Sequence, residues 1–243
     1  MEQWIRSLQE KAEGLRLDGK KAELPITAQQ AEELYRYMEL LLRWNEKMNL
    51  TALTDPMDIL SKHFLDSAAG GALLPAGSIA DIGTGAGFPG VVLKILNPEH
   101  PVVLMDALQK RLSFLQEVCS ELGLQDVELV HERAEEAGQK KEYRAQYDCA
   151  VSRAVAPLPV LLEYCIPMVR TGGVFLAYKG PALQEELHAS AHALGLLGCT
   201  VESVHKITLD GEDWEHMIAV IRKEKPTHPI YPRRQAKIKK DPL

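Results

Sequence analysis

Hydrophobic and polar positions in the middle of the chain alternate in blocks. Short apolar runs predict buried strands, and longer stretches with apolar residues three and four positions apart predict helices between them. The predicted strands lie at 78–82, 102–106, 127–131, 147–152, 173–178, 200–206 and 217–221. The predicted helices lie at about 90–96, 109–122, 156–169 and 182–197. This alternation is typical of an α/β protein with a doubly wound, mostly parallel sheet of the Rossmann-like type.

The last two predicted strands are joined differently from the others. Only residues 208–216 lie between them, which is too short for a crossover helix. They are therefore predicted to be antiparallel neighbours, so that the last of the seven strands runs against the rest of the sheet.

The N-terminal part of the chain has a helical pattern instead. Apolar residues recur at helical spacing after Thr27, a good N-cap, and a second amphipathic stretch follows Asp55. We therefore predict a helical cap at residues 1–70, a core at residues 71–222 and an extended basic tail at residues 223–243.

Residues 78–90 organise the predicted core. An apolar strand ends at Asp81, and Gly83, Gly85 and Gly87 then form a turn in which the backbone can approach a ligand closely. A strand, a glycine-rich turn and a helix in this order form the nucleotide-binding half of a doubly wound sheet.

The glycines alone leave two cofactors open. One register, from Gly85 to Gly90, matches the dinucleotide pattern Gly-x-Gly-x-x-Gly and is compatible with an NAD(P)-dependent oxidoreductase. A carboxylate beside the turn, Asp81, would repel a pyrophosphate and attract the cationic S-adenosylmethionine. Asp106, which ends the next strand, is placed to bind the ribose hydroxyls of either cofactor. We favour S-adenosylmethionine; a ribosome-associated binding factor with a vestigial pocket is a third interpretation.

Other candidate residues follow the later strands. Ligands of open α/β sheets bind beyond the carboxyl ends of the strands. Arg153 is the strongest candidate there, because a guanidinium at this edge can meet a phosphate or a base, and Arg133 is the second. His63 and Asp66 share a helix face, where a packing and capping pair is the more common role. The remaining candidates are Ala134 and Glu135, for an adenine edge, and Lys179.

The candidate residues favour a simple methyl acceptor. Guanine N7 already has a lone pair and needs no general base, which suits a site without a cluster of His, Cys and carboxylate groups. Cytosine C5 would require a nucleophilic cysteine. Many enzymes that methylate amino groups carry an Asn/Asp-Pro-Pro-aromatic turn after the fourth strand, where this chain has residues 152–155, Ser-Arg-Ala-Val.

Charge is distributed unevenly along the chain. The formal net charge is −6, yet eight basic residues stand against two acidic ones from Arg222 onward. Such asymmetry indicates a local contact with a polyanion. We therefore expect Arg233, Arg234 and Lys237, together with Lys179, to contact RNA.

Composition narrows the remaining possibilities. No apolar run reaches the length of a membrane span, and the acidic start of the chain differs from a secretion signal. The four cysteines are widely spaced and lack metal-ligand spacing. We expect a cytoplasmic monomer without a metal and without a membrane contact.

The chain resembles the bacterial RsmG family, also called GidB, of 16S rRNA guanine-N7 methyltransferases. The resemblance rests on residues 44–45, 49–52, 63–67, 81–90, 110–111, 114–115, 133–135, 152–154, 179–180 and 231–234. It implies an S-adenosylmethionine pocket formed by Gly83, Phe88, Ala134, Glu135 and Arg153. It also implies that the methyl acceptor is a guanine N7 in the decoding-region loop of 16S ribosomal RNA, as free RNA or within the small ribosomal subunit.

Two positions depart from the family pattern. Ala107 stands where the family commonly has Ser, which leaves the ribose contact of Asp106 intact. After Tyr-Pro the family usually continues Arg-x-Pro-Gly, whereas this chain has Arg-Arg-Gln-Ala, so the resemblance does not define the path of its tail.

Overall fold

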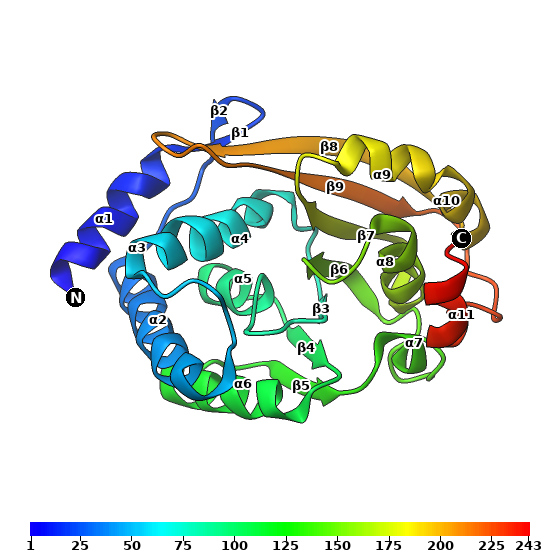
Figure 1. Cartoon of the computed structure of the whole chain (residues 1–243), viewed down its shortest axis with the longest axis horizontal. Helices are drawn as coiled ribbons and strands as arrows, with labels where there is room; N and C mark the ends of the chain where they lie inside the picture. The colour runs from blue at the N-terminus through cyan, green and yellow to red at the C-terminus, as the bar shows by residue number, and fades with distance from the viewer.

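The computed structural model describes all residues from 1 to 243 and contains one nine-stranded sheet between two layers of helices (Figure 1). The strand order is β2-β1-β8-β9-β7-β6-β3-β4-β5. The strands are β1 (Leu15–Leu17), β2 (Lys20–Lys21), β3 (Ile79–Ile82), β4 (Val102–Asp106), β5 (Val127–His131), β6 (Tyr147–Arg153), β7 (Val169–Lys179), β8 (Cys199–Leu209) and β9 (Glu215–Lys223). Strands β3 to β7 are parallel, and β9 runs antiparallel to both β7 and β8.

The helices form an N-terminal group, a central group and a C-terminal helix. The N-terminal group comprises α1 (Glu2–Glu13), α2 (Ala28–Met48), α3 (Pro56–Ile59), a π-helical turn (Leu60–Leu65), α4 (Asp66–Ala68) and a 3₁₀ turn (Ala69–Leu73). The others are α5 (Gly90–Leu96), α6 (Gln109–Leu122), α7 (Ala134–Ala137), α8 (Leu158–Cys165) with a 3₁₀ turn (Ile166–Met168), α9 (Leu183–Ala189), α10 (Ala191–Leu197) and α11 (Gln235–Lys240). None of the helices combines the length and the apolar character that a membrane span requires.

Alternating side chains of the sheet supply two separate hydrophobic cores. Ile79 and Leu104 belong to the core that the N-terminal helices, α5 and α6 cover, whereas Ala80 and Met105 belong to the core beneath α8, α10 and α11. This period of two is what a sheet covered on both faces requires. The doubly wound arrangement predicted from the sequence is confirmed.

The predicted strands are all present, and two more extend the sheet. Strands β1 and β2 form a short hairpin in which β1 pairs with β8, so the N-terminal region is helical only in part. Strand β1 has only three residues, Leu-Arg-Leu, which is too short for the alternation of apolar and polar residues to predict a strand. The long edge of β8 provides the pairing that stabilises it.

The helical cap packs on the glycine turn through α2. Thr27 and Gln30 form the capping box that starts this helix, as its sequence predicts. The Tyr37 hydroxyl, from the buried face of α2, donates a hydrogen bond to the carbonyl of Ala86. Gly87 lies so close that a Cβ there would stand 2.5 Å from this hydroxyl and would require an unfavourable φ of +98°.

The predicted extended tail is partly helical and folds against the core. Helix α11 buries Ile238 in the same core as α8. Arg233 forms an ion pair with the fully buried Glu163, at 2.7 Å between Nη2 and Oε2. The sequence predicted an extended tail in which Arg233 contacts RNA, but Arg233 and Ile238 instead anchor this segment to the core.

Removing the Tyr37 hydroxyl tests the contact between the cap and the turn. Tyr37→Phe leaves the buried Ala86 carbonyl without its donor, so we expect a loss of about 1–3 kcal/mol in the free energy of unfolding. Tyr35→Phe is the matched control, because its hydroxyl bonds the exposed Glu39, and it should stay within about 0.5 kcal/mol of wild type. Denaturant titrations that give equal losses for both variants would contradict the account.

Candidate cofactor and acceptor site

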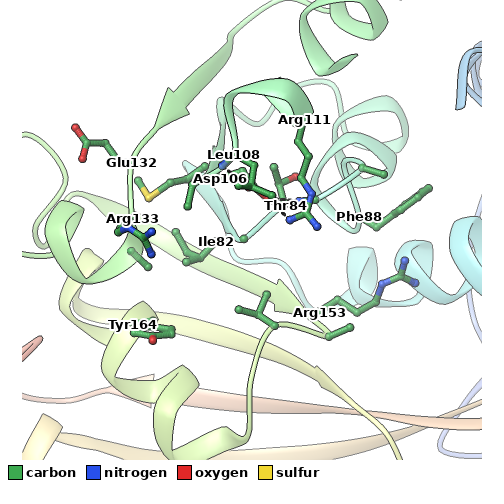
Figure 2. A pocket seen from close by; sticks show the side chains of 18 of the residues that line it. Ile82, Thr84, Phe88, Asp106, Leu108, Arg111, Glu132, Arg133, Arg153 and Tyr164 are labelled. Carbon is green, nitrogen blue, oxygen red and sulfur yellow. Dashed lines mark hydrogen bonds and ion pairs between the residues drawn. The ribbon is translucent and has the colours of Figure 1, made fainter. Parts of the chain in front are cut away.

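A cavity of about 490 Å³ opens at the carboxyl ends of β3 to β6. Figure 2 shows side chains from four successive strand ends converging on it. Of the sequence-predicted residues, its walls include Gly83, Gly85, Phe88, Asp106, Arg133, Ala134, Glu135 and Arg153. The cavity therefore lies at the edge of the sheet where the sequence predicted a ligand.

Gly85 forms part of a cradle without side chains. Its φ is +60°, and a Cβ added there would meet only the Gly83 carbonyl, at 3.9 Å. Any side chain at this position would therefore project into the cavity and take up ligand volume. The turn leaves room for a ligand that lies against its backbone.

Asp106 lies in the middle of the cavity wall, between Arg133 and Phe88 (Figure 2). The amide of Gly85 donates to its Oδ2 at 3.0 Å, and the amide of Leu108 donates to its Oδ1 at 2.8 Å. Arg111 Nη1 lies 3.2 Å from Oδ2. These three donors fix the carboxylate, and of its roughly four lone-pair sites one, on Oδ1, remains to accept a hydrogen bond from a ribose hydroxyl.

Asp81 lies off the cavity wall, contrary to the expectation that it contacts the methyl donor directly. It is fully buried beneath the turn, where Oδ2 accepts hydrogen bonds from the Thr84 hydroxyl at 2.7 Å and the Gly90 amide at 2.8 Å. Burial raises the pKa of Asp81 to about 7 against these two hydrogen bonds. Its Oδ1 has no partner, which adds to the cost of the charged form.

The position of Asp81 still bears on the choice of cofactor. A dinucleotide pyrophosphate would require free backbone amides where α5 begins, but the Gly90 amide is bound to Asp81. Gly87 also lies off the cavity wall, packed against α2. At Gly87 and Gly90 the turn therefore offers no free amide to the dinucleotide register.

Arg153 links the end of β6 to the π-helical turn. It donates to Asp66 Oδ2 at 2.6 Å, to the Lys62 carbonyl at 3.1 Å and to His63 Nδ1 at 3.0 Å. Its Cζ lies 5.0 Å from the centroid of the Phe88 ring, on which His63 also stacks at 4.5 Å. His63 and Asp66 are therefore more than a packing pair, since together they position Arg153.

The proton positions in this cluster follow from its contacts. Burial, together with the Arg153 charge, lowers the pKa of His63 to about 4, so the ring is neutral at physiological pH. Its Nδ1 accepts from Arg153, and Nε2 therefore donates to the Thr51 hydroxyl at 2.7 Å. His216 lies with Nδ1 2.7 Å from Asp66 Oδ1, and this hydrogen bond raises the pKa of His216. Burial alone would raise the pKa of Asp66, but its bonds to His216 and Arg153 lower it.

Arg133 and Arg153 do not come together, although both were predicted to be catalytic. Arg133 precedes α7 and lies at the end of the cavity away from Phe88 and Arg153 (Figure 2). Ala134, Glu135 and Tyr164 line that same end. The two guanidinium groups therefore do not meet at one point of the cavity.

A second cavity, of about 470 Å³, adjoins the first and shares His63, Arg153 and Ala154 with it. Its other lining residues include His216 and the predicted Lys179. The Nζ of Lys179 lies 2.7 Å from Oε2 of Glu186. The sequence pattern did not single out His216, which reaches the site from β9, or Tyr164, which lies on α8.

Comparisons with known proteins agree with this geometry. The family model described as rRNA small subunit methyltransferase G matches residues 30–214. A protein named ribosomal RNA small subunit methyltransferase G from Alkaliphilus metalliredigens is 48% identical over 90% of this chain and 92% of its own. The namesake from Desulfitobacterium hafniense is 45% identical over 94% of this chain and 95% of its own. The chain belongs to the rRNA small subunit methyltransferase G family.

Solved structures at lower identity support the fold of this family member. Wild-type Trm5b from Pyrococcus abyssi aligns with a TM-score of 0.52 at 13% identity, over 70% of this chain and 50% of that chain. A ribosomal protein L11 methylase from Lactobacillus delbrueckii subsp. bulgaricus aligns with a TM-score of 0.50 at 15% identity, over 68% and 79%. The shared part is the α/β fold.

The buried Asp81 makes a pH-dependent contribution to stability. Its pKa is about 7 in the folded protein and near 3.8 when unfolded, so the folded state alone holds the proton between these values. The free energy of unfolding therefore falls as pH rises through this window, by about 4 kcal/mol for this group. Asp81→Asn should remove that dependence and gain stability relative to wild type between pH 4 and pH 7.

Asp148→Asn is the control, because the pH dependence that Asp148 gives to the free energy of unfolding has the opposite sign. Hydrogen bonds from Ser78 and Arg170 outweigh burial and lower the pKa of Asp148, so this carboxylate stabilises the fold above its unfolded pKa. Urea titrations of the ligand-free proteins from below pH 4 up to pH 7 measure both effects, that of Asp148 as the pH falls below about 4 and that of Asp81 between pH 4 and pH 7. Wild-type and Asp81→Asn curves that run parallel would contradict the assignment.

Proposed function

We propose that this protein transfers a methyl group from S-adenosylmethionine to N7 of a guanine in the decoding-region loop of small-subunit (16S) ribosomal RNA. The observation that carries the proposal is the pair of adjoining cavities that share His63, Arg153 and Ala154. One cavity is suited to the methyl donor, and the other is suited to the acceptor base.

The first cavity provides matching partners for each part of S-adenosylmethionine. Gly83 and Gly85 leave space along the backbone, and Asp106 offers an acceptor to a ribose hydroxyl. The end with Ala134 and Tyr164 suits the adenine, which places the sulfonium beside Phe88 and Arg153. When bound there, the cofactor supplies an electrophilic methyl group.

The second cavity suits a polar, planar base. Its walls combine the cations Lys62 and Lys179 with the carboxylate of Glu186, whose Oε2 is bonded and whose Oε1 has no hydrogen-bond partner. A guanine offers O6 to a cation and N1–H and N2–H to a carboxylate, which leaves N7 free to face the first cavity. Entry from the second cavity brings N7 toward the shared residues.

The side chains at the wall that the two cavities share are not available to act as a general base. Both nitrogens of His63 and both oxygens of Asp66 already have partners. All four cysteines are buried, and burial raises their pKa values. This set favours an acceptor that has its own lone pair, such as guanine N7, in an in-line displacement that depends on alignment and exclusion of water.

Basic residues near the cavities are suited to the RNA backbone. Arg234 and Lys237 are exposed on and beside α11, and Lys179 lines the acceptor cavity. Arg233 binds Glu163, so we assign it the anchoring of this segment instead of a direct phosphate contact.

One assay tests both the methyl transfer to small-subunit RNA and the role of Arg153 between the two cavities. Wild type should transfer label from S-adenosylmethionine to RNA or subunits that lack the modification, and mass mapping should place it on a guanine. Arg153→Lys keeps the charge but loses the forked contact with three acceptors, so we expect about a hundredfold slower transfer. Arg170→Lys, at the exposed ion pair with Asp148, is the matched control and should transfer at the wild-type rate.

Two results would overturn the proposal. The first is no methyl incorporation by wild type into free RNA, assembly intermediates or subunits. The second is tight calorimetric binding of NAD without binding of S-adenosylhomocysteine, which would favour the oxidoreductase. An Arg153→Lys variant with full activity would show that methyl transfer does not depend on the contacts of the Arg153 guanidinium.

The exposed basic residues predict a salt-dependent RNA contact. Replacing Arg234 and Lys237 with Ala should weaken RNA binding and reduce the log–log salt slope by up to about two. Arg16 and Lys21, on the β1–β2 hairpin at the far edge of the sheet, provide the control pair. An unchanged slope for the α11 variant would show that this segment does not touch RNA.

A further inference from the structure

The C-terminal segment reaches the cofactor cavity itself. Gln235, the first residue of α11, lines the cavity together with Tyr164, Ala134 and Glu135. Those three residues lie on α7 and α8, whereas Gln235 lies about seventy residues further along the chain than Tyr164. One end of the cavity is therefore closed by a segment outside the α/β core.

Buried contacts hold this segment in place. Arg233 meets the fully buried Glu163 with its backbone amide at 2.7 Å, with Nε at 2.9 Å and with Nη2 at 2.7 Å. Glu163 is the neighbour of Tyr164, so this anchor adjoins the cavity wall. If the segment moved away, the buried Glu163 carboxylate would lose its only cation, which is strongly destabilising. The position with Arg233 bound to Glu163, called docked below, is therefore favoured.

Two further contacts fix the path of the chain before and after the anchor. The Arg144 guanidinium donates to the carbonyls of Gly138, Tyr231, Thr227 and His228 at 2.6–3.2 Å. Ile238 is fully buried in the core beneath α8 and α11. These contacts leave Gln235 with a restricted set of positions at the cavity rim.

We propose that Gln235 is a recognition residue for the adenine of the methyl donor, and that residues 231–240 form the wall that closes the adenine end of the cavity. The proposal rests on the proposed function, because it takes the ligand to be an adenosyl compound. A primary amide offers one donor and one acceptor side by side, and the amino and ring-nitrogen edge of adenine presents the complementary pair.

A consequence links the cofactor to the RNA surface. A ligand that contacts Gln235 in the docked segment must stabilise docking by the same factor by which docking improves its affinity. Arg234 and Lys237 belong to this segment and are exposed. The bound methyl donor would therefore order the basic residues that face the RNA.

Calorimetric titration with S-adenosylhomocysteine tests the contact. Gln235→Ala should raise the Kd about fivefold to a hundredfold, as expected for the loss of the two hydrogen bonds that the amide makes with the adenine edge. Lys239→Ala, an exposed position on the same helix, is the control and should leave the Kd unchanged. Circular dichroism checks that both variants are folded.

Hydrogen exchange of α11 supplies the reciprocal measurement. Saturating S-adenosylhomocysteine should slow exchange of the Ile238 and Asp241 amides, which bond Arg234 and Lys237 carbonyls, in wild type. In Gln235→Ala the slowing should shrink by the same factor as the affinity. Equal Kd values for wild type and Gln235→Ala, or no slowing in wild type at saturation, would overturn this inference alone. Failure of wild type to bind the ligand would instead overturn the proposed function.

Discussion

The site depends on one guanidinium held between two parts of the fold. Arg153 ends β6, yet its three acceptors all belong to the turn of helix at residues 60–66. The acceptor Asp66 is almost completely buried, so its charge requires this cation, and the pair ties the N-terminal helices to the sheet. Because Arg153 lines both cavities, the interaction that joins the cap to the core also sets the boundary between the two cavities.

The helical geometry of the cap follows from the same contact. Residues 60–65 form a π-helical turn, an irregularity that is frequent at functional sites because it shifts side chains off the usual helical register. Here it brings the Lys62 carbonyl, the His63 ring and the Asp66 carboxylate to the same guanidinium. The sequence predicts an amphipathic helix in this region, but the extra residue in the turn depends on tertiary contacts that no local pattern encodes.

The central parallel strands and the helices between them could be predicted from the sequence, because a sheet buried on both faces leaves a strong apolar signal at residues such as Ile79 and Leu104. Gly85 and Asp106 were also found, since ligand chemistry and strand ends coincide there. Asp81 was singled out by its charge and expected to contact the ligand, but its carboxylate lies beneath the turn, where Thr84 and Gly90 bond it. His216 and Gln235 were missed because each arrives from an element far along the chain. The same reason explains why Arg233 was predicted to contact RNA: its partner Glu163, the one acidic residue of the otherwise apolar α8, lies seventy residues earlier in the chain.

The most direct test of the two-cavity arrangement is a crystal structure of the complex with S-adenosylhomocysteine. The account predicts adenine between Ala134, Tyr164 and Gln235, a ribose hydroxyl on Asp106, and the sulfur beside Phe88 facing the cavity that contains Lys179 and His216. Density with the adenine beside Phe88, or with the sulfur turned away from Arg153, would contradict it.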